Sequence, residues 1–219
     1  MQVKINNSNG FTLLELLLAL AIFMIVIGAA YSTFLSQQNS YIVQEQVAGM
    51  QQNIRSAMFL MQRDLRMAGY DPTPNVGLNP GGITALSSTP GSSQVTFEYI
   101  DDTNTPNTLV TVSYSLYTSQ GRQNLGRSLN GSINSSIADN IDALDLLFFD
   151  AAGVLTTIPT QVVSVEITIV ARADRDDLDY TNTTVYSNQA GTPIFASPTD
   201  HLRRRMLTTR VKCRNLNLP

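Results

Sequence analysis

The stretch GFTLLELLLAL, residues 10–20, places a carboxylate, that of Glu15, inside an apolar run. The run extends to Leu35, and its clearly polar side chains are Thr12, Glu15, Ser32 and Thr33. As one helix, residues 11–35 would be about 37 Å long, which is enough to cross a hydrocarbon layer of about 30 Å. A carboxylate in the middle of a bilayer costs about 2.5 kcal/mol or more, so we expect Glu15 to have a function and a partner.

Two ordinary explanations of this segment are open. A cleaved secretory signal would use Lys4 as its basic region and Gly28-Ala29-Ala30 as its cleavage site, but its apolar region would be unusually long and would contain Glu15. A plain single-pass anchor has the right length but leaves Glu15 unexplained. A third explanation starts from the order of the residues: a short polar leader, then Gly10, then Phe11 and the apolar run.

This order resembles the class III signal of type IV prepilins and of the pseudopilins of type II secretion. The resemblance implies a leader of residues 1–10, cleavage between Gly10 and Phe11 by a prepilin peptidase, and methylation of the new amino-terminal Phe11. It also implies that Glu15, the fifth residue of the mature chain, sets the register of the subunits as a filament grows.

The chemistry of Glu15 fits that role. Cleavage would give Phe11 a free amine that stays cationic when methylated, and the amino end of a helix already favours nearby negative charge. Within one chain the amine and the Glu15 carboxylate lie one helical turn apart, and Glu15 can instead meet the Phe11 amine of a neighbouring chain. In a low dielectric such a pair is far stronger than in water. The alternative is a Glu15 side chain that extends to the lipid headgroups.

The distribution of basic residues predicts the orientation of the segment. Lys4 precedes the apolar run, and no Lys or Arg follows it until Arg55. The positive-inside rule therefore predicts a single pass through the inner membrane with a cytoplasmic amino terminus. The rest of the chain would lie in the periplasm before assembly, and on a pilus or the cell surface afterwards.

The helical signal continues beyond the membrane segment, over residues 36–69. Apolar residues recur at steps of three or four at Val47, Met50, Ile54, Ala57, Met61, Leu65 and Ala68. Gly69 can end the helix, and Pro72 prevents its continuation. Because no proline interrupts residues 11–68, a single helix of about 87 Å is allowed. The alternative is two helices with a break near Ser36–Asn39.

The second part of the chain reads as a loop followed by strands. Residues 70–94 are rich in Pro and Gly and predict a connecting loop. Alternating or continuous apolar runs then predict strands near residues 95–99, 110–116, 144–149, 163–169 and 206–213. We therefore predict an α+β fold: a long amino-terminal helix, membrane-spanning in its first half, packed against a mostly antiparallel sheet that forms a β-rich head over residues 95–219. The prepilin resemblance implies the same type IV pilin-like architecture.

Two further stretches narrow the resemblance. QQNIRSAMFLMQRDLRMAGYDP at residues 51–72 and RRRMLTTRVKCRNL at 203–216 resemble the helix end and the closing strand of PilW-type minor pilins, which are relatives of the J-type pseudopilins. This resemblance implies a minor pilin in a priming or tip complex, with other pilins as partners through the amino-terminal helix. The alternatives are a type II secretion pseudopilin and, in another class, an anchored adhesive or sensory binding domain.

The remaining chemistry-bearing residues give weak signals. A net charge of −3 argues against a nucleic-acid binder, and no cofactor motif is present in the sequence. His201, the single histidine, and Cys213, the single cysteine, read as a loop residue and a buried strand residue. We therefore expect no enzymatic activity.

Clustered charges near the carboxyl end give two further expectations. Four carboxylates, Asp174, Asp176, Asp177 and Asp179, form a weak calcium candidate, although the spacing fails the EF-hand pattern and a solvated loop is favoured. For the basic residues between Arg203 and Arg214 we expect pairing with acidic groups rather than DNA binding.

Overall fold

The computed structural model of the chain describes residues 10–73, 77–103, 105–196 and 198–216. The chain divides after Glu45 into two compact units, which we call the N-terminal unit and the C-terminal unit. Helix α1, Leu13–Met67, contributes residues to both units. The helix has no interruption at Ser36–Asn39, so the alternative of two helices is wrong.

The end of α1 follows from its sequence. Gly69 has a φ of +76°, a conformation that glycine adopts without strain, and its N–H donates to the carbonyl oxygen of Glu98 at 2.8 Å. The amide of Ala68 donates to the carbonyl of Leu65, and that of Tyr70 donates to the carbonyl of Met67. The chain therefore leaves the helix at a hydrogen-bonded turn and passes directly to the sheet.

Five antiparallel strands form the first sheet of the C-terminal unit. They are β1 Ile83–Ser87, β2 Gln94–Asp101, β3 Thr108–Ser119, β4 Arg122–Leu129 and β5 Ser135–Ala138, and each pairs with the next in the chain. Such a meander needs only short connections between neighbouring strands.

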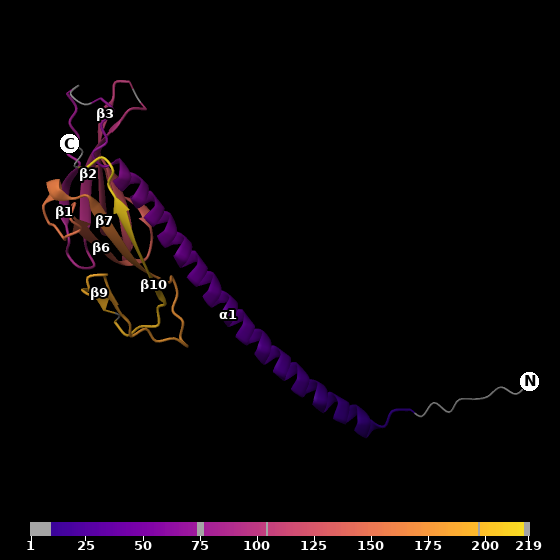
Figure 1. The fold of residues 1–219 in the computed structure, drawn as a ribbon. Coiled ribbons are helices and arrows are strands. Elements are labelled where there is room, and N and C mark those ends of the chain that lie inside the picture. Colours follow the sequence, from indigo (N-terminus) through magenta and orange to yellow (C-terminus); the bar gives the residue numbers. More distant parts are fainter. Residues whose placement is uncertain (1–9, 74–76, 104, 197, 217–219) are drawn as a thin grey trace, which may run out of the picture. The chain divides into compact units, whose positions relative to one another are not determined.

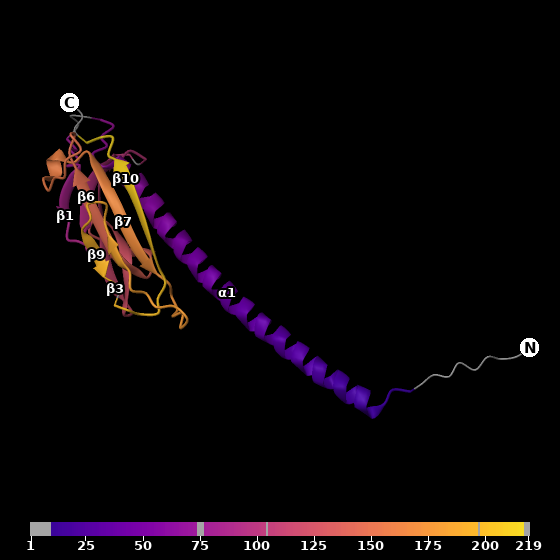
Figure 2. The ribbon, with the colours of Figure 1, turned by 60° about the horizontal axis from the view of Figure 1, so that its bottom comes forward.

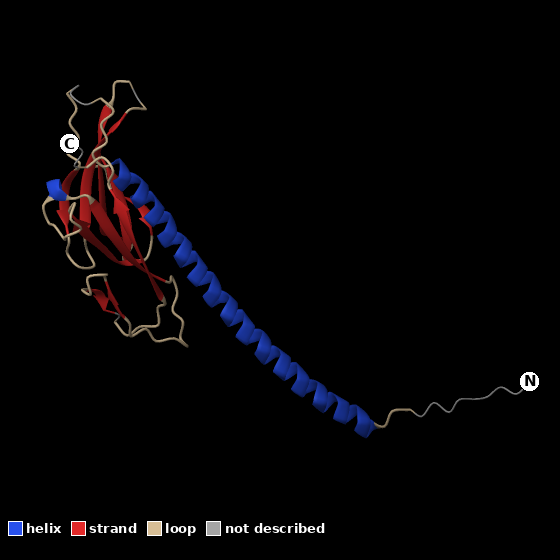
Figure 3. Ribbon diagram, viewed as in Figure 1, coloured by secondary structure: helices blue, strands red, loops and turns tan. Residues whose placement is uncertain are grey.

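Three antiparallel strands form the second sheet, in the order β10-β7-β6 (Figure 2). They are β10 Arg204–Lys212, β7 Ser164–Arg172 and β6 Ile141–Phe149. A short 3₁₀ helix, η1 Pro159–Gln161, lies between β6 and β7 in the chain. The hairpin of β8 Val185–Ser187 and β9 Pro193–Ala196 belongs to the segment 173–203, which connects β7 to β10 (Figures 1 and 3). The other described residues of this segment form loops.

One hydrophobic core joins the helix and both sheets within the C-terminal unit. From α1 it takes the predicted stripe, with Met50, Ile54, Ala57, Met61, Leu65 and Ala68 buried and Val47 packed against them. The sheets add the inward side chains of the predicted strands, among them Phe97, Tyr114, Leu146, Ile167 and Val211. The α+β fold with a long helix packed against antiparallel strands is confirmed.

Several strands were not predicted. The segment 70–94, predicted as a loop, contains β1, whose short run ITALS has one buried residue, Ile83, and so gives no alternating signal. Strand β4, RQNLGRSL, is largely polar, yet Asn124 and Ser128 are buried in it. Strands β8 and β9 are too short to show a period.

Candidate functional site

The start of α1 is held by a reciprocal set of hydrogen bonds. The Thr12 amide and hydroxyl both donate to Glu15 Oε2 at 2.9 Å, and the Glu15 amide donates to Thr12 Oγ1 at 3.3 Å. This Thr-x-x-Glu arrangement is a capping box, in which each side chain satisfies an amide that the first helical turn leaves open. The Thr-x-x-Glu spacing is visible in the sequence, although the cap was not predicted.

The apolar first half of α1 buries none of its residues within the described chain. Leu13 to Ala30 are exposed throughout, and the helix is long and apolar enough to cross a membrane. Thr33, within the apolar segment, donates its hydroxyl to the Ala29 carbonyl at 3.0 Å, which satisfies a polar group that lipid could not. This surface therefore needs lipid or other apolar helices as its surroundings.

The predicted sites of processing lie at this end of the described chain. Gly10 and Phe11 immediately precede the capping residue Thr12, in exposed backbone outside the helix. The rest of the predicted leader, residues 1–9 including Lys4, lies outside the described residues. Cleavage between Gly10 and Phe11, methylation of Phe11 and the assembly role of Glu15 stay predictions.

A second carboxylate of α1, Asp64, is buried in the C-terminal unit. Its Oδ2 accepts from the Tyr114 hydroxyl and from Arg127 Nε, both at 2.7 Å, and its Oδ1 accepts from Arg63 Nε and Nη2 at 3.1 and 3.0 Å. Burial and the Asp64 charge raise the pKa of Tyr114 well above its usual range, so that it donates. This cluster ties α1 to β3 and β4. Asp64 lies outside the apolar stripe that the helical period marks, so the period gives no sign that it is buried.

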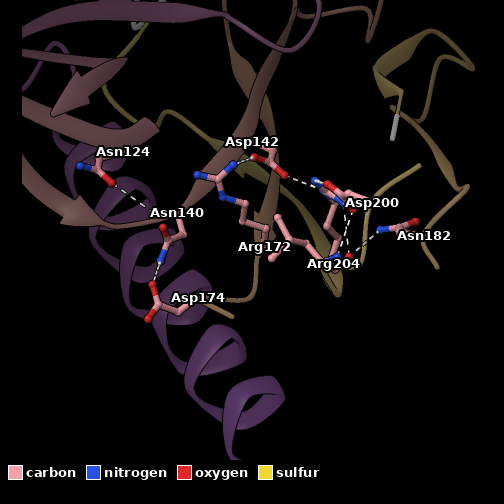
Figure 4. A network of polar contacts seen from close by, with 9 residues as sticks. Asn124, Asn140, Asp142, Arg172, Asp174, Asn182, Asp200 and Arg204 are labelled. Atoms are coloured by element: carbon pink, nitrogen blue, oxygen red, sulfur yellow. Dashed lines mark hydrogen bonds and ion pairs between the residues drawn. The ribbon is translucent and has the colours of Figure 1, made fainter. Parts of the chain in front are cut away.

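A buried arginine holds the segment 173–203 against the second sheet (Figure 4). Arg204 donates from Nε to Asp142 Oδ2 and from Nη1 and Nη2 to the two oxygens of Asp200, each at 2.6 Å. Arg172 lies 3.4 Å from Asp142, and Asn182 donates to the Leu202 carbonyl at 3.1 Å. Bidentate hydrogen bonds between charged groups, such as those of Arg204 with Asp200, are stronger than hydrogen bonds between neutral groups.

The predicted acidic segment takes part in separate ion pairs. Asp174 pairs with Arg122, and Asp177 pairs with Arg203 at 2.7 Å. The Asp177 Oδ1 also accepts from the Asp179 amide at 3.2 Å. In the described parts of the chain no group of three or more His, Cys, Asp or Glu side chains is arranged to hold a metal ion, so the geometry gives the calcium candidate, which includes Asp176, no support.

The other residues singled out in the sequence have structural surroundings. His201 is exposed, with Nδ1 2.7 Å from the Tyr180 carbonyl oxygen. Cys213 is buried in the core, and burial raises the pKa of its thiol to about 12. Of the carboxyl-terminal basic residues, Arg203 and Arg204 pair with acidic groups of the same chain, as expected.

Comparison with known proteins gives matches at both ends of the chain. Residues 5–31 match the model of the prokaryotic N-terminal methylation motif, and residues 131–215 match the model of type IV pilus-assembly protein W. The stretch at 51–72 lies outside both matches. A solved type IV-like pilin from Thermus thermophilus is similar in fold, with a TM-score of 0.54 and 14% identity over 75% of this chain and 97% of that chain. No curated protein sequence matches significantly.

The methylation motif and the fold are both those of type IV pilin-like proteins. The second match narrows this class, because the motif and the PilW segment together indicate a PilW-type minor pilin in type IV pilus assembly. Similarity to the pilins suggests a structural protein and implies interaction with other pilins and processing by a prepilin peptidase. The motif and the apolar helix suggest membrane anchoring and association with a pilus.

Proposed function

We propose that this minor pilin enters a filament through the pairing of Glu15 with an amine created by proteolysis. The prepilin peptidase cuts between Gly10 and Phe11, and Phe11 is then methylated. The observation that supports this most is the position of Glu15: it lies on an exposed apolar helix, and Thr12 is the residue that hydrogen-bonds it in the described chain. The carboxylate therefore retains acceptor capacity for a partner.

Cleavage changes the chemistry of this helix end. Before the cut, Glu15 accepts the amide and hydroxyl of Thr12. After the cut, the Phe11 ammonium of the same or a neighbouring subunit competes for the same carboxylate. Transfer into a low-dielectric bundle of helices strengthens that pair and penalises an unpaired carboxylate, so assembly proceeds in the register that matches the two groups.

The location follows from the same segment. The chain spans the inner membrane once, with its leader in the cytoplasm and its C-terminal unit in the periplasm until assembly. The PilW match supports a position near the filament tip or in the complex that primes assembly. In this position few copies are needed, and the apolar half of α1 packs against the helices of other pilins.

The test compares two valine variants on one helix. Glu15→Val is expected to insert, to be cleaved and to be methylated, and to reduce piliation strongly. Glu45→Val makes the same change at an exposed position of α1 and should leave piliation normal. Intact mass of the mature wild-type chain should show loss of residues 1–10 and gain of one methyl group. Normal piliation of Glu15→Val, or an intact leader in assembled filaments, would overturn the proposal.

Deletion of the gene separates the alternatives. Loss of pili with normal secretion supports the pilus role. Loss of secretion with normal pili would assign the chain to a type II secretion system, and normal pili and secretion with lost adhesion would assign it to the anchored binding proteins.

A further inference from the structure

The second sheet has a polar outer face beside its apolar inner one. On β7, Val165, Ile167 and Ile169 enter the core, whereas Ser164, Glu166 and Thr168 alternate with them and point the other way. Ser164 lies opposite Phe149 of β6 and Lys212 of β10, and Glu166 lies opposite Arg210. The register therefore gathers two cations, a carboxylate and an aromatic ring at one end of this face.

Arg210 is held in a fixed direction on this face. Its guanidinium carbon lies 3.7 Å from the centre of the Phe149 ring, and its Nε and Nη2 donate to Ser164 Oγ at 3.1 and 3.0 Å. Stacking on a ring together with hydrogen bonds fixes a side chain that is otherwise free. The guanidinium is thus displaced along the strand from Glu166, its cross-strand neighbour.

The position of the Arg210 guanidinium affects the hydrogen bonding of Glu166. Glu166 is 4% exposed, and its Oε1 atom is buried without a hydrogen-bond partner in the described chain. Burial raises the pKa of Glu166, the Arg210 charge lowers it, and the Asp145 charge raises it further. An arginine opposite a buried carboxylate lowers the free energy most when it pairs with it. Arg210 instead bonds Ser164, and Glu166 Oε1 is left without a donor in the described chain.

Arg210 faces an open cleft of about 420 Å³. The cleft is lined by Arg210, Lys212, Ser164 and Val163 of the sheet edge and by Asp150, Ala151 and Gly153 of the turn after β6. Arg210 and Lys212 are two residues apart on one strand, so both point to the same side about 7 Å apart. The Asp150 Oδ1 is engaged by the amides of Ala152 and Val154 at 2.9 and 2.8 Å.

We propose that this cleft binds an oxyanion, a carboxylate or phosphate group, between Arg210 and Lys212. The guanidinium has N–H groups beyond those bonded to Ser164, and the Lys212 ammonium supplies a second charge. Val163 and Ala151 add apolar side chains to the wall of the cleft. Arg210 is directed toward the cleft while Glu166 Oε1 has no hydrogen-bond partner among the described residues. This proposal does not depend on the assembly role of Glu15.

The first test measures anion binding to the full chain in micelles of a neutral detergent. Inorganic phosphate or acetate replaces chloride at constant ionic strength, and the side-chain Nε–H NMR signal of Arg210 is followed. We expect a saturable shift in the wild type, and Lys212→Gln should weaken binding by about tenfold, the usual value of a lost charged hydrogen bond. Arg205→Gln removes the same charge from the opposite face of β10 and should change nothing.

The second test uses the neighbouring carboxylate. Glu166→Gln removes the negative charge that competes for Arg210, so it should tighten anion binding several-fold. Stronger binding of acetate would identify a carboxylate ligand, such as an acidic side chain of another protein, and stronger binding of phosphate would identify a phosphate group. Linear, unsaturated shifts with both anions, or equal affinities in the wild type and Lys212→Gln, would overturn the proposal.

Discussion

The two halves of α1 have opposite surroundings although they belong to one helix. From Leu13 to Ala30 every residue is exposed and nearly all are apolar. From Met50 to Leu65 most apolar residues are buried against the sheets, and the exposed residues are largely polar, with Phe59 as the exception. The first half has no partner within the described chain, and the second half is part of a core. A helix of one hydrophobicity pattern could not serve both purposes.

The carboxylates of the two halves sharpen this comparison. Asp64 is 4% exposed and receives hydrogen bonds from Tyr114, Arg127 and Arg63. Glu15 is exposed and receives hydrogen bonds from Thr12 alone in the described chain. An acid satisfied within its own chain stabilises that chain, whereas an acid with spare acceptors on an apolar surface is available to another molecule.

The largest effect is expected from removing Asp64. Asp64→Leu leaves the Arg127 charge, in a side chain 17% exposed, and the Tyr114 hydroxyl without their acceptor. Breaking a buried pair in this way costs about 3–5 kcal/mol of unfolding free energy. Chemical denaturation of the C-terminal unit, followed in the full chain by circular dichroism in micelles, measures it.

A multiple variant separates loss of the pair from loss of packing. Asp64→Leu with Arg127→Met and Tyr114→Phe removes the carboxylate together with its two more buried partners and leaves Arg63, whose side chain is 60% exposed. This variant should be more stable than Asp64→Leu alone. If the triple variant is the less stable of the two, the cluster does not act through buried polar pairing.

A smaller loss of unfolding free energy is expected when Met61, in the second half of α1, is truncated to alanine. Met61 is fully buried, and Met61→Ala should cost about 2–4 kcal/mol through lost burial and the cavity it leaves. Phe59, two residues away and 70% exposed, is the matched control, because Phe59→Ala should change the unfolding free energy by less than about 0.5 kcal/mol. Equal losses in the two variants would contradict the face assigned to the core.

The next largest effect is a dependence of the unfolding free energy on pH, caused by the titration of Glu166. Because its pKa is raised in the folded chain, the folded state binds this proton more tightly than the unfolded state does. The unfolding free energy contributed by this group therefore falls as pH rises from its ordinary pKa of 4.5 to the raised value.

The substitution Glu166→Gln should remove the decrease in unfolding free energy that Glu166 causes as pH rises. The variant should gain stability relative to the wild type at pH 7, by about 1 kcal/mol as for an unsatisfied buried polar group, and gain less at pH 4. Thermal melting at both pH values gives the difference, and a gain that is the same at both would show that the carboxylate charge is not responsible.

We expect the smallest effect from a substitution of Glu15, measured by the thermal stability of the C-terminal unit. Every buried residue of the described chain lies at or after Met50, so Glu15→Val should leave the melting midpoint of this unit unchanged. The loss of the cap, about 1 kcal/mol, is confined to the first turn of α1. A lowered midpoint would mean that the two halves of the helix unfold together, and would weaken the contrast drawn between Glu15 and Asp64.

The elements that the sequence predicted are those with a long apolar period. The stripe from Val47 to Ala68 and the alternation along β3 and β7 persist over enough residues to identify a helix face and two strands. Strands β1, β5, β8 and β9 have at most five residues each and are specified by their pairing partners, which a local pattern cannot contain.

The functional residues that the sequence patterns did not reveal are buried polar residues. Asp64 and Glu166 occupy positions that a hydrophobic period assigns to solvent, because the period distinguishes faces and does not show what later segments cover them. On the outer face of the second sheet, for example, Ile194 of the segment 173–203 packs on Ala143 and Val170. The Thr12–Glu15 cap, by contrast, was readable from four adjacent residues.

The closure of the segment 173–203 has a consequence for how such a chain can diversify. Its two ends meet, with the Ala173 amide donating to the Arg203 carbonyl at 2.8 Å, and β7 and β10 pair in regular register on either side of it. Insertions, deletions or sequence drift between these points leave that register intact. The length and sequence of the exposed part of this segment can therefore change over generations without altering the pairing of β7 with β10.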